Sequence, residues 1–189
     1  MADTCLDGVL ATTINANCPN PFQGFEDTAY IFNKSQIGTL TFDRGTGIVS
    51  GFIMADSGKK GYAVKDDSDK PFGSLKVTGE KKPYMIVFNK EMKLALIGNG
   101  ATVISQVNTL TKGEYVMLVK QIGVDTQDGK YLLVGVESPL RFDASTFEAS
   151  SDIFGHEVTL KEINARSVGF YIKAASAELT ESLVAALLD

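Results

Sequence analysis

The chain has 189 residues, of which 44% are hydrophobic and 22% charged, and its formal net charge is −5. This length is enough for one domain with a sizeable core, and the composition is that of an ordinary globular chain. The negative charge argues against a protein that binds nucleic acid by neutralising phosphates. Two cysteines, Cys5 and Cys18, are too few for a disulfide scaffold, and sequence alone does not say whether they pair.

Residues 1–30 are predicted to form an irregular N-terminal extension. The stretch NANCPNPFQGFEDT contains two prolines, a glycine and several turn-forming polar residues. It also contains Phe22 and Phe25, which a typical disordered tail would lack. We expect this extension to pack along its own domain or a neighbouring subunit, with Phe22 and Phe25 as candidate assembly contacts.

Residues 31–173 are predicted to form a mainly β domain, an antiparallel β-sandwich or barrel. Short apolar or alternating runs such as IGTLTFD, SLKVTG and HEVTLKEI follow one another between turn-forming clusters. Many short strands at regular spacing are typical of sandwiches and barrels. The stretch from Asp143 to Asp152 is polar and is interpreted as a linker between strands.

Two long apolar hairpins are expected within this domain. In LALIGNGATVISQV, Gly98 and Gly100 begin the G-x-G-x-x-G pattern of dinucleotide-binding proteins, but Val103 stands where the third glycine belongs. The β-branched residues that follow favour a strand over a helix, so the Asn-Gly pair predicts a tight turn within a hairpin over residues 84–107. A later Asp-Gly pair predicts a second hairpin over residues 114–136.

Residues 174–189 are predicted to form a short C-terminal helix. The stretch SAELTESLVAALLD is rich in helix-forming Ala and Leu, and Leu179, Leu183 and Leu187 fall on one helical stripe. A helix this short is marginal alone, so its stripe must dock. Docking on its own sheet is the usual case, but contact with another subunit is the alternative, and the three leucines are therefore candidate assembly contacts.

No pattern indicates an enzyme, a metal site or a cofactor. His156 is the single histidine, and the sequence lacks the G-x-S-x-G motif whose nucleophile a histidine base would activate. The acidic stretches KDDSDK and DTQDGKY do not match a calcium-binding loop. No run approaches the roughly 20 apolar residues of a membrane helix, and the N-terminus does not resemble a signal peptide. A glycosidase-like carboxylate pair is the one catalytic arrangement that sequence leaves open.

The chain resembles virion structural proteins of tailed phages that infect Bacteroidetes-type bacteria. The opening CPNPFQGFEDTAYIFNKSQI is similar to the Cys-x-Asn-Pro…Tyr-Ile-x-Asn lead-in of such proteins and covers about a tenth of the chain. The predicted β-sandwich with one helix also resembles the tail tube proteins of phages.

The resemblance implies a non-enzymatic protein of the virion tail or neck, made in the host cytoplasm. Its subunits would form a ring, stacked into a tube with other tail or neck proteins as partners, through which DNA passes without specific binding. The sheets of adjacent subunits would join into an inner barrel, and a negative lumen would repel the phosphate backbone. The hairpins and both termini would make the contacts between subunits.

Two alternatives remain. The first is that the chain is another virion component, either a neck or adaptor ring protein or a head decoration protein. The second is that it is a host- or glycan-binding β-sandwich module. The absence of Trp counts against sugar stacking, although Tyr30, Tyr62 and Tyr84 remain available.

Overall fold

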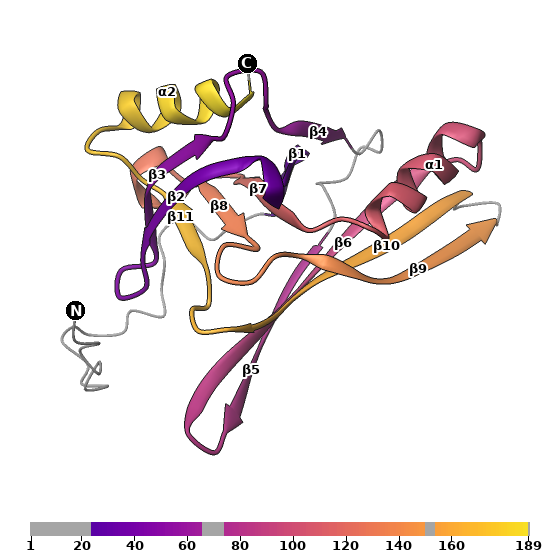
Figure 1. Cartoon of the computed structure of the whole chain (residues 1–189), viewed down its shortest axis with the longest axis horizontal. Coiled ribbons are helices and arrows are strands. Elements are labelled where there is room, and N and C mark those ends of the chain that lie inside the picture. Colours follow the sequence, from indigo (N-terminus) through magenta and orange to yellow (C-terminus); the bar gives the residue numbers. More distant parts are fainter. Residues whose placement is uncertain (1–23, 66–73, 150–153, 189) are drawn as a thin grey trace.

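The computed structural model describes residues 24–65, 74–149 and 154–188, and these ranges contain eleven strands and two α-helices. The strands form one seven-stranded sheet and one four-stranded sheet, here called sheet A and sheet B. The prediction of a mainly β, largely antiparallel chain with a C-terminal helix is confirmed, and the two sheets form a sandwich-like arrangement (Figure 1).

Sheet A has the strand order β2-β3-β11-β8-β7-β1-β4. Its strands are β1 (Phe25–Asn33), β2 (Ile37–Asp43), β3 (Ile48–Met54), β4 (Tyr62–Lys65), β7 (Tyr115–Gln121), β8 (Tyr131–Val134) and β11 (Phe170–Ile172). Neighbouring strands of sheet A run antiparallel, except that β11 is parallel to β3. Short 3-10 turns follow β1 (Lys34–Gln36) and precede β8 (Thr126–Asp128).

Sheet B has the strand order β5-β6-β10-β9, and all its pairs are antiparallel. Its strands are β5 (Ser74–Lys82), β6 (Met85–Ile97), β9 (Arg141–Ala149) and β10 (Phe154–Ala165). With 13 and 12 residues, β6 and β10 are the longest strands in the described ranges. Sheet B therefore extends beyond sheet A, and its β5–β6 hairpin projects from the body of the molecule (Figure 1).

Sheet A is covered on both faces. Met117 and Val119 face sheet B and pack in one buried cluster with Met92 and Leu160 of that sheet. The intervening side chains of β7 belong to a second cluster on the opposite face, together with side chains of helix α2 (Ala177–Leu188). Because successive side chains of a strand point to opposite faces, burial on both sides explains the unbroken apolar run of β7.

The two hairpin predictions have different outcomes. Strands β7 and β8 pair antiparallel within residues 114–136, as predicted, but most of their side chains are buried inside sheet A. The hairpin over residues 84–107 is wrong, because β6 pairs with β5 and β10, and Ala101–Leu110 forms helix α1.

Tertiary packing explains why this stretch is helical. Val103, Val107 and Leu110 are spaced so that a helix places them on one side, and all three pack against the cluster between the sheets. That burial outweighs the weak preference of Val, Ile and Thr for strands. The chain enters the helix through Gly98, whose φ of 98° is accessible mainly to glycine.

The polar linker predicted from Asp143 to Asp152 is also wrong within the described residues. Residues up to Ala149 belong to β9, the edge strand of sheet B, and pair with β10. Most β9 side chains are exposed on both faces, so the strand lacks the apolar alternation by which strands are recognised.

Candidate assembly surface

The four predicted assembly contacts within the described residues do not form one surface. Phe22 lies outside the described residues. Phe25 opens β1 and is only 7% exposed, in the cluster between the sheets. Leu187 is 2% exposed and Leu183 packs partly buried against the second cluster, whereas Leu179 is 56% exposed. The helix α2 thus docks on its own sheet A, which accounts for Leu187 without a second subunit.

The predicted domain limits can be compared with the observed elements. Strand β1 begins at Phe25, inside the segment assigned to the N-terminal extension, and its residues lie in the interior of sheet A between β7 and β4. Strand β11 ends at Ile172, and α2 begins at Ala177. Residues 1–23, including both cysteines, lie outside the described residues.

The edges of sheet B are its most accessible backbone. Strands β5 and β9 occupy the two edges, and each is nine residues long. Within the described ranges, no further strand pairs with the outer side of either one. All of their side chains are at least partly exposed. Unpaired edges of this length are templates for pairing with another chain.

The tip of the β5–β6 hairpin is apolar and exposed. Tyr84 is 97% exposed, and Met85 and Ile86 are about half exposed. The tip is the part of sheet B that projects farthest from sheet A in Figure 1. Exposed apolar side chains gathered at one point of a surface are typical of interaction sites.

The face of sheet B that points away from sheet A carries paired charges. Lys93 on β6 and Glu157 on β10 form an ion pair of 2.7 Å. Lys161 on β10 pairs with Asp143 at 2.7 Å and with Glu91 at 3.6 Å. The pKa of Lys93 and that of Lys161 are raised, chiefly by the hydrogen bonds that these ammonium groups donate to Glu157 and to Asp143. This face is balanced in charge rather than negative.

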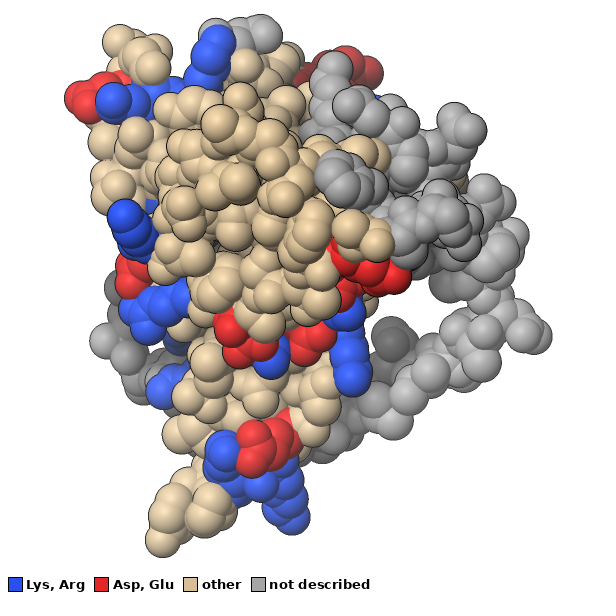
Figure 2. All heavy atoms as spheres, turned by 90° about the vertical axis from the view of Figure 1, so that its right-hand side faces the viewer, with Lys and Arg blue, Asp and Glu red and all other residues tan. Residues whose placement is uncertain are grey.

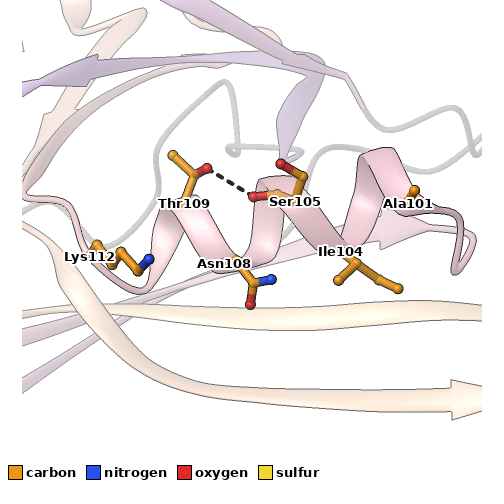
Figure 3. Close-up of a pocket in the computed structure, with 6 residues that line it drawn as sticks. All are labelled: Ala101, Ile104, Ser105, Asn108, Thr109 and Lys112. Atoms are coloured by element: carbon orange, nitrogen blue, oxygen red, sulfur yellow. Dashed lines mark hydrogen bonds between the residues drawn. The ribbon is translucent and has the colours of Figure 1, made fainter.

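The helix α1 presents an uncharged surface to solvent. None of its ten residues is charged, and Val107 is the one that is buried. Figure 2, from the side where α1 lies, shows a broad uncharged centre with charged side chains around and below it. The outward side of the helix, where Ile104 and Asn108 project, borders a shallow hollow of about 580 Å³ that ends near Lys112 (Figure 3).

A buried ion pair lies within sheet B, on the face that packs toward sheet A. Lys90 on β6 and Glu162 on β10 are 1% and 0% exposed, and their charged atoms are 2.9 Å apart. Glu162 also accepts hydrogen bonds from the backbone N–H groups of Gly135 and Ser138. The Lys90–Glu162 contact is electrostatic, because Lys90 Nζ meets no acceptor with hydrogen-bond geometry in the described chain.

Lys90 also borders a second hollow, of about 590 Å³, between the sheets. Its walls are largely apolar, with side chains such as Leu75, Leu132 and Val134. Arg44 lies at its rim but is held by Glu137 through a contact of 2.6 Å. Both cations of the hollow thus already have carboxylate partners, so the hollow offers no net charge to a ligand.

Two carboxylates, Glu181 and Glu137, form hydrogen bonds that connect helix α2 and several loops to sheet A. Glu181 of α2 accepts hydrogen bonds from Thr126, Lys130 and the Tyr131 hydroxyl. Burial acts to raise the pKa of Glu181, but these hydrogen bonds outweigh burial and lower it. Burial, followed by the Glu181 contact, raises the pKa of Tyr131. These hydrogen bonds hold α2 against sheet A.

Glu137, in the segment between β8 and β9, acts in the same way. It binds Arg44 of the turn between β2 and β3 and accepts hydrogen bonds from the backbone N–H groups of Arg166 and Ser167. Burial acts to raise its pKa, but the Arg44 and backbone hydrogen bonds prevail and lower it. The carboxylate therefore joins three loops.

The remaining sequence candidates contribute no chemistry to this surface. His156 is the third residue of β10; its ring is tilted against that of Phe147, and its Nε2 is 3.2 Å from the amide oxygen of Asn99. The Gly98–Gly100 turn does lead from a strand into a helix, but β6 is antiparallel to both neighbours, unlike the parallel β-α-β unit of dinucleotide sites. The acidic residues of KDDSDK beyond Lys65 lie outside the described residues.

Among the described residues, no group of three or more His, Cys, Asp or Glu side chains is placed to hold a metal ion. None of the helices in the described ranges is long and apolar enough to cross a membrane.

No protein-family model, curated protein or solved structure matches this chain. The case for a function therefore depends on the geometry of the chain itself. Its most distinctive feature is the long, open-edged sheet B. Sequence reasoning missed this surface, because β9 was interpreted as a linker and β5 was not recognised as an edge.

Proposed function

We propose that this chain is a non-enzymatic virion structural protein that assembles into a ring or tube of a phage tail through which DNA passes. The observation that carries the proposal is sheet B, a sheet of long strands with two accessible edges. In the order β5-β6-β10-β9, every neighbour is antiparallel, so β5 and β9 run in opposite directions.

These directions suit repetition around a ring. When a second copy is placed beside the first by rotation about a ring axis to which the strands are tilted, as in barrels, β9 of one copy meets β5 of the next antiparallel. Each added copy continues the alternation, and closure of the ring leaves sheet B without edges. A contact between two different surfaces of one chain is what a ring requires.

In this assembly the exposed face of sheet B lines the channel. The resemblance implied a negative lining, but the paired lysines and carboxylates of this face suggest another route to the same property. Lysines held by Glu157, Glu91 and Asp143 offer few free cations to a phosphate backbone. DNA would then slide past a balanced surface instead of being repelled.

The test is the mass of the full-length protein, measured by light scattering with negative-stain microscopy over a range of concentrations. We expect rings or short tubes. A Val77→Lys variant, which places a charge on the β5 edge, should reduce assembly, whereas Ile53→Lys should not. Ile53 is the matched control, because it is an exposed β-branched residue of β3 in sheet A, outside sheet B. A strict monomer under all conditions would contradict the proposal, and a glycan-binding screen would then test the module alternative.

A further inference from the structure

The two edge strands of sheet B carry matching pairs of neighbouring side chains. On β5, Lys76 is followed by Val77, which is 36% exposed. On β9, Phe147 is followed by Glu148, and Phe147 is 42% exposed. Each edge thus presents one large apolar side chain beside one exposed charge, and the two charges are opposite. Proteins usually avoid apolar side chains on an edge that stays in water.

The two apolar side chains point to the same face of sheet B. Val77 lies opposite Lys90 of β6, and Phe147 lies opposite His156 of β10. Through the pairing of β6 with β10, both belong to the face that packs toward sheet A. Lys76 and Glu148 therefore belong to the opposite face, with the paired charges. The faces already agree, as they must for the two edges to continue one sheet.

Resting on the proposed function, we infer that β9 of one copy pairs antiparallel with β5 of the next copy in one register, with Phe147 opposite Val77. The same register places Glu148 opposite Lys76 and Thr146 opposite Thr78. Apolar, oppositely charged and Thr–Thr pairs are the cross-strand pairs that stabilise antiparallel sheets.

Other registers lose this match. A slip of one residue turns every side chain of β9 to the wrong face. A slip of two residues in either direction keeps the faces but places Val77 opposite Ser145 or Ala149. One such slip also places Lys76 opposite Thr146, so the charge pair is lost. Among face-preserving registers, the proposed one joins both the apolar and the charged pair.

Cysteine cross-linking tests the register directly. The full-length chain with Cys5→Ser and Cys18→Ser would carry Val77→Cys together with Phe147→Cys. Within one chain these positions are three strand spacings apart, or about 14 Å across the sheet, and the residues level with them on β6, Lys90 and Leu96, are six positions apart along the strand. Both separations put the two positions beyond the reach of a disulfide. Directly opposed residues of neighbouring chains are within reach. We expect mild oxidation to give a ladder of covalent oligomers.

The matched control pairs Val77→Cys with Ser145→Cys, which lies two residues along β9 on the same face. This pair should cross-link far less. If it forms the ladder and the Phe147 pair does not, the register is overturned while the edge-to-edge assembly stands. Phe147→Cys alone should give no covalent dimer, and a strong dimer would show that β9 pairs with β9 of a second copy instead.

Charge reversal gives an independent test. Lys76→Glu and Glu148→Lys should each weaken assembly about fivefold, and the double variant should recover most of that loss. Lys93→Glu is the control, because Lys93 lies on the same face of sheet B but inside the sheet, paired with Glu157. Equal losses without recovery would overturn the Lys76–Glu148 contact. Absence of any assembly by the wild type would overturn the proposed function as well.

Discussion

Sheet A and sheet B differ in how their two faces are covered. Sheet A is enclosed, with sheet B on one face and α2 on the other, and the strands β7 and β8 are almost entirely buried. Sheet B has longer strands, one open face and two accessible edges. The comparison indicates that sheet A supplies most of the buried core, and in the proposed function sheet B supplies the surface for association.

The largest expected effect is in sheet A. Phe32 of β1 is 0% exposed and packs tilted against Phe52, so Phe32→Ala should lower the free energy of unfolding by about 4 kcal/mol. Val77→Ala on the edge of sheet B should cost less than about 1 kcal/mol in the monomer. Urea unfolding at a concentration below assembly measures both. Similar losses for the two variants would contradict the division of roles.

The next effect is at the junction of the sheets. Glu162→Ala leaves the Lys90 ammonium buried without its counter-charge and should cost about 3 kcal/mol. A double variant, Lys90→Met with Glu162→Leu, should recover much of this loss, because neither charge is then buried. Thermal unfolding compares the two. A double variant as unstable as the single one would mean that hydrogen bonds to Glu162, and not the unpaired charge, dominate.

The stability that α2 gains by docking on sheet A should depend on pH. The pKa of Glu181 is lowered in the folded chain, so its contribution to stability is present above the ordinary pKa of Glu, about 4.3, and is lost as the pH falls through the folded pKa. Glu181→Gln should therefore be less stable than the wild type near pH 7 and lose less stability on acidification. Unfolding curves at several pH values measure this difference. If the stability of the wild type and that of Glu181→Gln changed with pH in parallel, Glu181 would not be the cause of the pH dependence.

The smallest effect is expected on the open face of sheet B. The side chains of Lys93 and Glu157 are 41% and 53% exposed, so their ion pair is screened by solvent. A double-mutant cycle of Lys93→Ala and Glu157→Ala should give a coupling of about 0.5 kcal/mol or less for unfolding. A coupling above about 2 kcal/mol would mean that this face also stabilises the monomer.

Local sequence patterns predicted several elements closely. IGTLTFD coincides with β2, and the run in GIVSGFIMA contains β3. The hairpin of β7 and β8 follows from two apolar runs and an Asp-Gly turn, where Gly129 has a φ of 102°. These predictions succeeded because strands packed on a core repeat their apolar pattern locally.

Two elements at the candidate surface could not be predicted in this way. Helix α1 consists largely of residues that favour strands, and β9 has few apolar residues and little alternation. Both are defined by what lies beside them in space. Consequently, the proposed pairing of Val77 with Phe147 could not be inferred from a sequence in which residues 143–152 were interpreted as a linker.

The sequence by itself determined the mainly β character of the chain and the amphipathic helix at its end, because apolar periodicity and turn residues act over a few neighbouring positions. Only the tertiary structure decided which strands lie at the edges, which face remains open, and that Val103, Val107 and Leu110 form a helix. Those outcomes depend on contacts between residues far apart in the chain, where the burial of side chains outweighs local conformational preference.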